Sequence, residues 1–352
     1  MQTLIYPWAD TVPDTGKTIA ITPFLRWVRM PLPFALDHIN LWLVQDGENS
    51  EGAWSIIDTG ISHETTQNAW QAIFRDELFN SPLKRLFVTH MHPDHVGLAA
   101  WLCEQYHLPL WMSMTDYLLA KWLISTEGSQ QGSVAGGGGA AEHFQRHGLA
   151  EPDDLVKIRQ RANYYQNMVP SMPLRYTRLM HDDQVQIGNH RWRVIAGYGH
   201  APEHLSFYCE AQGILISGDM VLPRISTNVS VFDSEPDANP LKLYLDSLSR
   251  YADLPADTLV LPSHGKPFRG LHLRVEQLRQ HHEARLEETL TACGQAPQSA
   301  RDLVPVLFKR ALDLHQLTFA MGEAIAHLNY LWHAGSLSRE LCADGILRFS
   351  KG

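Results

Sequence analysis

The chain has 352 residues, of which 44% are hydrophobic and 19% are charged. This length is enough for two domains, and the composition excludes an intrinsically disordered chain. The formal net charge is −9, from 29 Lys and Arg against 38 Asp and Glu, so the sequence has no general attraction for nucleic acid or for anionic membranes.

In the first half of the chain, strand-like and helix-like segments alternate. Residues 38–45 and 53–58 have the composition of strands and are separated by a turn-rich stretch. Residues 62–79 have helical spacing, residues 83–89 form a short strand that runs into a group of histidines, and residues 96–106 resemble a helix. This order predicts an α/β layered fold in which strands lead into loops at one edge.

Residues 114–170 interrupt this alternation. We expect a helix at 117–124, a glycine-rich break at 128–141 that no regular element tolerates, and a polar helix at 151–166. We interpret the segment as an inserted helical cap with a flexible link, the alternative being a surface excursion without a role.

The second half returns to strands and then becomes mainly helical. Strands are expected at 190–196, 204–209, 213–217 and 258–265, a helix at 240–251, and helices from residue 271 onward. The tail is expected to close as a hairpin about Asp344 and Gly345. We place a domain boundary near Phe268, which gives an N-terminal domain at 1–268 and a mainly helical C-terminal domain at 269–352.

The strongest chemical signal is FVTHMHPDHVG at residues 87–97. It places His90, His92, Asp94 and His95 within six residues at the end of a strand. Neutral imidazoles and a carboxylate that face one cavity suit a divalent cation. His90 and His92 can point the same way from an extended loop, whereas Asp94 and His95 lie where the chain turns into a helix. The arrangement therefore predicts two adjacent metal positions.

Three further ligand-type residues each follow a predicted strand. They are His200 in GYGHAPEHLS, Asp219 in ILISGDM and His264 in LVLPSHG. Any one of them alone would more often be a cap or turn residue. Because α/β folds build their sites from loops at one edge of the sheet, we expect the three to join the histidine-rich loop.

The set IIDTG, THMHPDH, GHAPEH, SGDM and PSHG, in this order over roughly residues 20–268, resembles the metallo-β-lactamase superfamily of dinuclear hydrolases. The resemblance implies a four-layer αββα sandwich with its site at one edge. It also implies that one metal is held by His90, His92 and His200 and the other by Asp94, His95 and His264. Asp219 would bridge the two metals. Asp58 would lie behind the histidine-rich loop and orient it by hydrogen bonding.

One departure from the family pattern lies in GHAPEH, where many members have GHTPGH. Glu203 replaces a glycine, which puts the backbone bend at this position in doubt because glycine often marks a positive φ. We treat His204 as a structural neighbour and not as a ligand.

The resemblance further implies the chemistry of the site. Water shared between the two metals loses a proton near neutral pH and attacks the substrate, with Asp94 and Asp219 as the catalytic carboxylates. The ligand set suits two divalent ions, zinc above all, with iron and manganese as alternatives. No GxSxG elbow accompanies these motifs, so the sequence does not call for a covalent route.

The C-terminal region is similar to the winged-helix-like extension of the group around lactamase-β-like protein 2, on the segments HHEARLEETL and AIAHLNYLWHAG. Residues 270–352 contain 9 Lys and Arg and 9 Asp and Glu, whereas a nucleic-acid module usually has a basic excess. We therefore expect these helices to form a wall of the pocket or a surface for self-association, and we do not expect a nucleic-acid partner.

These observations favour a metal-dependent hydrolase of a small carbonyl substrate: a thioester, a lactone or another ester. The alternatives are a phosphodiesterase or ribonuclease with the same two metals, a persulfide-dioxygenase-like oxidoreductase with one iron, and a scaffold without activity. Arg224 and residues 226–228 either line the pocket or form a plain polar loop, and Tyr198 either stabilises an oxyanion or packs. Apolar area for the substrate would come from Trp111, Tyr117 and Trp122.

The cellular location is predicted from what the sequence lacks. The N-terminal residues have no basic region followed by an apolar one, and the apolar runs are too short to span a bilayer. The four cysteines, Cys103, Cys209, Cys293 and Cys342, are far apart and indicate no disulfide framework. We expect a cytoplasmic protein with no membrane partner.

Overall fold

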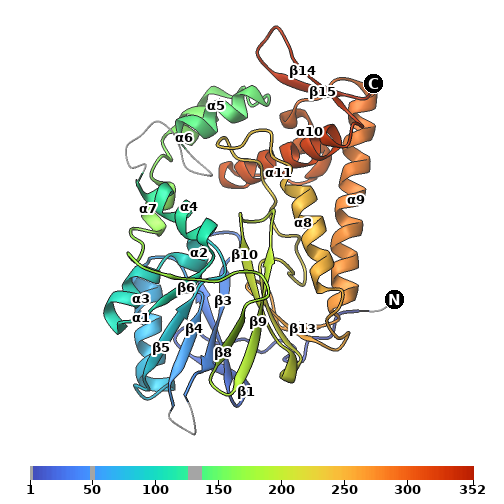
Figure 1. Cartoon of the computed structure of the whole chain (residues 1–352). Helices are drawn as coiled ribbons and strands as arrows, with labels where there is room; N and C mark the ends of the chain where they lie inside the picture. Colours follow the sequence, from blue (N-terminus) through green and yellow to red (C-terminus); the bar gives the residue numbers. More distant parts are fainter. Residues whose placement is uncertain (1–2, 48–51, 126–136) are drawn as a thin grey trace.

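Two β-sheets pack face to face, and helices cover the outer face of each sheet (Figure 1). The structure is a computed structural model that describes residues 3–47, 52–125 and 137–352. The expected four-layer αββα sandwich is confirmed, as are the inserted cap and the mainly helical C-terminal region. Among the described residues, no helix combines the length and apolar character that a membrane span requires.

The first sheet contains seven strands that are neighbours in chain order. Antiparallel pairs join the first four strands, and parallel pairs join the fourth to the seventh. The sequence analysis did not identify the first two strands, which build the outer edge. The strands are β1 (Thr18–Thr22), β2 (Leu25–Pro31), β3 (His38–Gln45), β4 (Trp54–Ile57), β5 (Leu83–Phe87), β6 (Leu110–Met112) and β7 (Thr177–Arg178).

The second sheet contains six strands in the order β13-β12-β11-β10-β9-β8. The pair β11 and β12 is parallel, and the other neighbouring strands of this sheet are antiparallel. Large apolar side chains from both sheets, Trp27, Trp42, Phe87, Trp192 and Phe207, fill the space between the sheets. The strands are β8 (Gln184–Ile187), β9 (His190–Gly197), β10 (His204–Cys209), β11 (Ile214–Gly218), β12 (Leu259–Pro262) and β13 (Phe268–Arg269).

Each outer face carries its own helical layer. The first sheet is covered by α1 (Glu64–Ala72), which continues into the π-helical turn η1 (Ile73–Glu77), and by α3 (Ala99–Tyr106) after the short helix α2 (Pro93–Val96). The second sheet is covered by α8 (Pro240–Leu248) and α9 (Leu271–Gln295). Two single 3₁₀ turns, η2 (Glu210–Gln212) and η3 (Ser249–Tyr251), complete this half.

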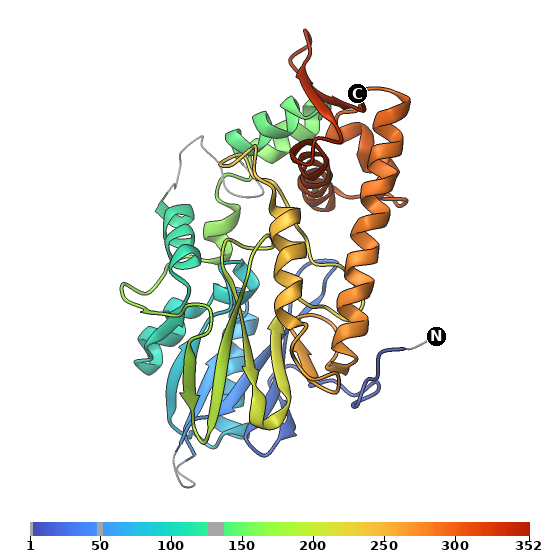
Figure 2. The same cartoon turned by 45° about the vertical axis from the view of Figure 1, so that its right-hand side comes forward.

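The C-terminal region is a group of three helices followed by a hairpin. Helix α9 runs from the second sheet to the far end of the molecule, where it meets the hairpin (Figure 2). Helices α10 (Ala300–Leu307) and α11 (Leu314–His333) both begin with a capping box. The predicted hairpin is confirmed as β14 (Ser338–Leu341) and β15 (Leu347–Ser350). The domain boundary near Phe268 stays a prediction.

The described residues of the cap form four helices, which pack on two different partners. Helices α4 (Met114–Ser125) and α7 (Tyr164–Met168) join the apolar cluster of the first sheet. Helices α5 (Gly138–Arg146) and α6 (Pro152–Arg159) join the cluster that includes α10 and α11. An ion pair of 2.6 Å between Arg301 and Glu151 adds to the second contact. The glycine-bearing half of the cap therefore rests on the C-terminal region.

Two predictions about the cap are wrong in detail. Gly138 and Gly139 begin α5 and are not part of a break, because the alanines and Phe144 that follow them bury an apolar face. The polar helix expected at 151–166 is two helices, α6 and α7, with a turn between them. The remaining part of the predicted glycine-rich break, up to residue 136, lies outside the described residues.

Candidate metal centre

Four strand ends bring the seven predicted ligands together. The loop after β5 carries His90, His92, Asp94 and His95, and the ends of β9, β11 and β12 supply His200, Asp219 and His264. Within each of three overlapping groups, the nearest ligand atoms all lie within 4.8 Å of one another. Residues that are far apart in the sequence thus meet at one edge of the sandwich, as the motif order predicts.

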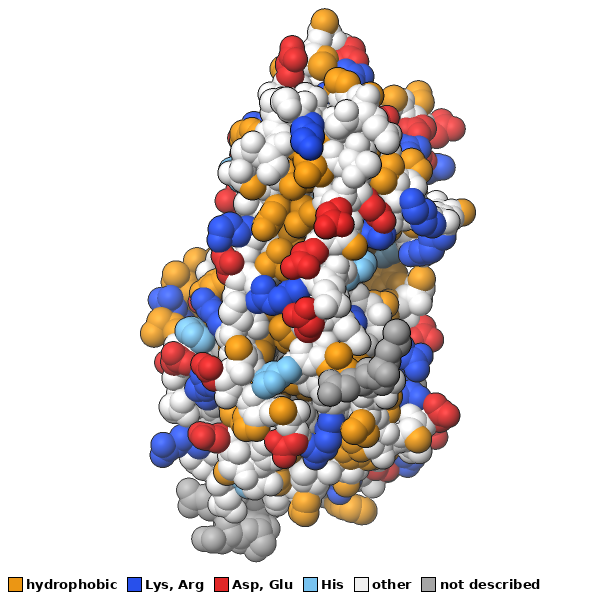
Figure 3. Space-filling view, turned by 90° about the vertical axis from the view of Figure 1, so that its right-hand side faces the viewer, with side chains coloured by type: hydrophobic (Ala, Val, Ile, Leu, Met, Phe, Trp, Pro, Cys, Tyr) orange, Lys and Arg blue, Asp and Glu red, His pale blue; other side chains and the backbone are white. Residues whose placement is uncertain are grey.

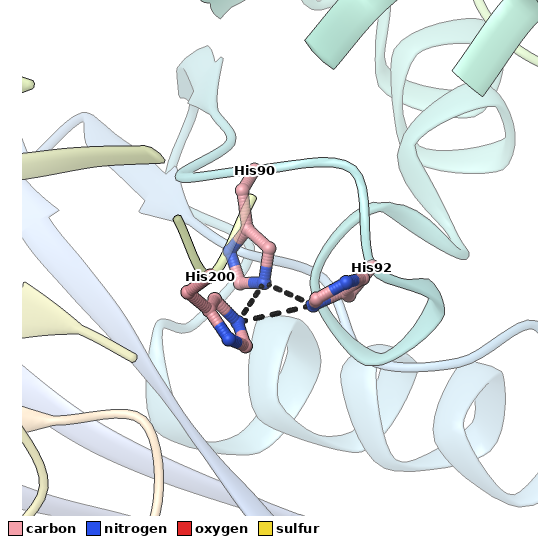
Figure 4. Close-up of side chains that lie close together, drawn as sticks. All are labelled: His90, His92 and His200. Carbon is pink, nitrogen blue, oxygen red and sulfur yellow. Dashed lines mark hydrogen bonds between the residues drawn. The ribbon is translucent and has the colours of Figure 1, made fainter. Parts of the chain in front are cut away.

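Three histidines converge on one point. His90 Nε2 lies 2.8 Å from His92 Nδ1 and 3.1 Å from His200 Nε2, and 3.1 Å separates His92 Nδ1 from His200 Nε2. Figure 4 shows the three rings turned toward one another. Three imidazole nitrogens that face a common point are a typical ligand set for a catalytic zinc ion.

A second group lies beside the first, and Asp219 lies between them. His264 Nε2 is 3.4 Å from Asp94 Oδ2 and 3.5 Å from Asp219 Oδ1, and His95 Nε2 is 3.6 Å from each of these two oxygens. The other oxygen, Asp219 Oδ2, lies 3.3 Å from His200 Nε2. The two oxygens of Asp219 therefore face different groups, which is what a bridging carboxylate requires.

The two groups differ in the charge that they favour. Burial lowers the pKa of His92 to about 3 and lowers that of His90, so both rings are neutral and offer lone pairs. Burial also opposes protonation of His264, but the carboxylates of Asp219 and Asp94 outweigh it and raise the pKa of His264 to about 10. The second group attracts positive charge, which a bound cation would supply.

Hydrogen bonds behind the ligands fix the ring orientations. Asp58 Oδ2 lies 2.9 Å from His95 Nδ1, and Asp58 Oδ1 accepts the backbone N–H of Thr89 at 2.8 Å. Asp58 has a positive φ of 62°, a conformation that Asp tolerates better than most residues. His264 Nδ1 lies 2.8 Å from the carbonyl oxygen of His38. The contact expected of Asp58 with the histidine-rich loop is present.

A buried carboxylate that the sequence analysis did not consider joins two ligand loops. Asp116, at the start of α4, accepts the backbone N–H of Met91 at 2.9 Å and that of Glu203 at 2.8 Å. Burial raises the pKa of Asp116 to about 6. Tyr165 of α7 donates to the carbonyl of Met91 at 2.6 Å. In the sequence, Ser113-x-x-Asp116 at a predicted helix start was the signal that could have drawn attention to Asp116.

In the GHAPEH loop, the backbone accepts Glu203 at the position where many family members have glycine. Glu203 has no positive φ, and the positive φ in this loop falls on Gly199, at 96°. His204 is buried, and its Nε2 accepts the backbone N–H of Asp219 at 3.0 Å. His204 thus supports the backbone of Asp219 from behind, in line with its interpretation as a structural neighbour.

A cavity of about 510 Å³ opens onto the cluster. This volume is within the range of about 300–1,000 Å³ that is typical of small-molecule sites. Loops of the sandwich, the cap helices α5 and α7, and residues 308–323 of the C-terminal region form its wall. The ligands His92, Asp94, His200, Asp219 and His264 lie on this wall with apolar residues such as Leu32, Phe34, Phe144, Met168, Phe308 and Phe319.

The residues that line the cavity can be compared with the predicted pocket residues. Residues 226–228 line the cavity, whereas Arg224 does not and instead lies over the ring of Tyr6. Tyr198 packs at the cluster between the sheets, with the Arg250 guanidinium 5.0 Å from its ring. Tyr198 is therefore a packing residue and does not face the reaction site.

The prediction that three aromatic residues contact the substrate is wrong. Trp111 packs on Phe87 between the sheets, Tyr117 stacks on Tyr176, and Trp122 is 44% exposed. None of the three lines the cavity. The three side chains have the apolar area that a substrate wall needs, but Trp111 and Tyr117 pack into the apolar clusters of the sandwich. The cap instead supplies residues of α5 and α7.

Comparison with known proteins identifies the family. The model of the metallo-β-lactamase superfamily matches residues 35–264, and the model of the metallo-β-lactamase-like C-terminal domain matches residues 286–352. The chain belongs to the metallo-β-lactamase superfamily. The predicted resemblance is confirmed for both regions.

Relatives of this superfamily member match it over most of their length. The Bacillus subtilis protein named "Probable metallo-hydrolase YqjP" is 24% identical over 314 residues, which cover 86% of this chain and 91% of that protein. A β-lactamase-like protein 2 homolog of Caenorhabditis elegans is 22% identical over 320 residues, covering 90% and 83%. A β-lactamase domain protein from Burkholderia ambifaria is 53% identical, with a TM-score of 0.92 over 99% of this chain and 98% of that one.

The donor set fits divalent cations. His95 Nε2 and Asp219 Oδ1 are buried, and neither finds a hydrogen-bond partner in the part of the chain that the structure describes. A buried polar atom without a partner costs about 1–3 kcal/mol, and a cation bound between these two atoms would remove that cost. Both atoms face the second group, where the carboxylates already favour positive charge.

Proposed function

We propose that this metallo-hydrolase superfamily member cleaves a thioester, lactone or other ester whose acyl part is apolar. The observation that carries the proposal is the cavity of about 510 Å³, which joins the ligand cluster to a mainly apolar wall. A substrate with a reactive carbonyl at the cluster and an apolar body along Phe34, Phe144 and Phe319 fits this arrangement.

His90, His92 and His200 would hold one cation, Asp94, His95 and His264 the other, and Asp219 would contact both. Two divalent ions, zinc being the best match to these ligands, would lower the pKa of water and polarise the substrate carbonyl. Asp94 belongs both to the cluster and to the cavity wall, so its carboxylate can orient the attacking water and accept its proton.

The phosphodiesterase or ribonuclease alternative has less support. Within the described residues, Arg310 is the one Lys or Arg side chain that lines the cavity, whereas a nucleic-acid groove needs a basic surface. On the face shown in Figure 3, Lys and Arg side chains are intermixed with Asp and Glu. The one-iron oxygenase alternative would leave His95 and His264 without a ligand role.

The test is a metal analysis paired with a substrate panel. Protein purified without chelator or nickel resin is expected to contain about two metals per chain and to hydrolyse acyl thioesters, lactones or nitrophenyl esters faster than bis(nitrophenyl) phosphate. Asp94→Asn should lose this activity, and the matched control His107→Asn, at an exposed position, should keep it. Hydrolysis of the phosphodiester alone, or one iron per active chain, would contradict the proposal.

A further inference from the structure

The segment between Asp219 and α8 connects the ligand cluster to the C-terminal helices. We call residues 220–231 the strap. Thr227 Oγ1 lies 2.9 Å from His200 Nδ1, and the carbonyl oxygen of Asn228 lies 2.8 Å from the same nitrogen. An N–H at Nδ1 that donates to this carbonyl leaves Nε2 of His200 free as a ligand and fixes the plane of the ring.

Helix α11 holds the strap by close backbone contact. The N–H of Val231 donates to the carbonyl of Gly322 at 3.3 Å. A Cβ at Gly322 would lie 2.5 Å from Ser230 Oγ and 2.7 Å from Ser230 Cβ, which is too close for either atom to remain in place. Ser230 Oγ in turn donates to Asn228 Oδ1 at 2.7 Å. Glycine inside a helix costs about 1 kcal/mol relative to alanine, and this contact explains its presence.

Helix α9 holds the other end of the strap. Arg274 is 9% exposed, and its guanidinium donates to the carbonyl of Leu222 at 2.5 Å and to that of Ile225 at 2.9 Å. In the described part of the chain, no carboxylate pairs with Arg274, and Gln277 is its other hydrogen-bond partner, so strap carbonyls are the main compensation for this buried charge. The strap is thereby fixed on both sides of the residues that contact His200.

From these contacts we infer that the C-terminal domain positions the metal ligand His200, with Gly322 and Arg274 as positioning residues that act through the strap. The inference rests on the two-metal site proposed above and not on the reaction that the site performs. It assigns the C-terminal domain a part in metal binding, in addition to its place in the cavity wall.

The test compares cobalt binding by wild-type protein and by Gly322→Ala, with the affinity measured against a chromophoric chelator and the cobalt spectrum recorded. Alanine favours the helix, so helix stability alone predicts no loss. Displacement of the strap predicts instead a loss of about 10- to 100-fold in affinity at the three-histidine position, as for other residues behind metal ligands, and a changed spectrum. The other position should keep its cobalt.

Two further variants test whether displacement of the strap causes the loss of cobalt affinity. Ser230→Gly removes both atoms that a Cβ at residue 322 would strike, so the double variant with Gly322→Ala should recover most of the affinity. Asn329→Ala is the matched control, because Asn329 donates to the carbonyls of Pro236 and Ala238, beyond the strap. It should destabilise the domain without changing the cobalt spectrum.

Arg274→Lys provides a second route if Gly322→Ala does not fold. A lysine cannot donate to Leu222 and Ile225 with the geometry of a guanidinium, so we expect a smaller loss of affinity at the same position. Affinity within threefold of wild type in both variants, or an equal loss in Asn329→Ala, would overturn the inference. Wild-type protein that binds no cobalt would refute the metal centre itself, and the inference with it.

Discussion

Glu323 gives a direct test of the electrostatics of the cavity. This carboxyl group projects from α11 into the cavity wall, next to the Asn228 side chain. Burial raises its pKa to about 7, although hydrogen bonding by Asn228 partly opposes the shift. The folded protein therefore binds more protons than the unfolded chain between about pH 4.5 and 7, and its stability falls as the pH rises through this interval.

The size of the effect follows from the pKa. A rise from 4.5 to about 7 corresponds to about 3 kcal/mol at alkaline pH, at 1.36 kcal/mol per pKa unit. Glu323 is only partly buried and its side chain borders the cavity, so solvent screening reduces this figure to about 1–2 kcal/mol. Glu323→Gln keeps the shape and removes the charge, so the variant should be more stable than wild type by this amount at pH 8.5.

Urea unfolding of both proteins in the same metal state, at pH 5 and pH 8.5, measures the effect. The stability advantage of Glu323→Gln should grow between these two values by about 1–2 kcal/mol. Glu340→Gln, at an exposed position of β14, is the matched control and should change little at either pH. An advantage that is equal at both pH values, or a glutamine variant that is less stable at pH 8.5, would refute the reasoning.

Three other outcomes are expected. Asp219→Ala should lose the second metal and most activity while the fold survives, because two cations would face each other without their shared anion; turnover within a few-fold of wild type would exclude a bridging role. Asp116→Ala should lower the metal content and should lower the free energy of unfolding in urea by about 2–4 kcal/mol, because two backbone N–H groups lose their acceptor. The control Ser113→Ala should have a small effect on both quantities. Burial lowers the pKa of His282 to about 3 and that of His327 to about 4, so the stability of the protein should fall as the pH drops below about 6.5. His327→Gln should reduce this acid sensitivity, as measured by thermal unfolding at pH 5 and pH 7.

The sequence was sufficient for the ligand cluster because each ligand follows a strand or starts a helix. The ends of β5, β9, β11 and β12 meet at one edge of the sandwich, so local order in the chain becomes proximity in space. The supporting contact of Asp58 follows from the same geometry. Their role as metal ligands stays a prediction until a metal is measured.

The cavity wall could not be read from the sequence in this way. Phe144, Tyr164 and Phe319 come from helices whose positions depend on packing between distant parts of the chain. Trp111 and Tyr117 were better candidates by residue type, but tertiary packing directs them into apolar clusters. Asp116 was missed because an acidic residue at a helix start is most often a cap, and only its contacts with Met91 and Glu203 distinguish it.

The division of the cavity between ligand loops and distant helices bears on how substrate preference can change during evolution. The predicted metal ligands come from the strand ends, whereas much of the wall comes from α5, α7 and the chain between Phe308 and Glu323. Substitutions in those helices can alter the shape of the bound molecule without touching a ligand. We therefore expect paralogues to keep the ligand cluster and to diverge in the molecule that fits the cavity, first of all through the segment from Phe308 to Glu323.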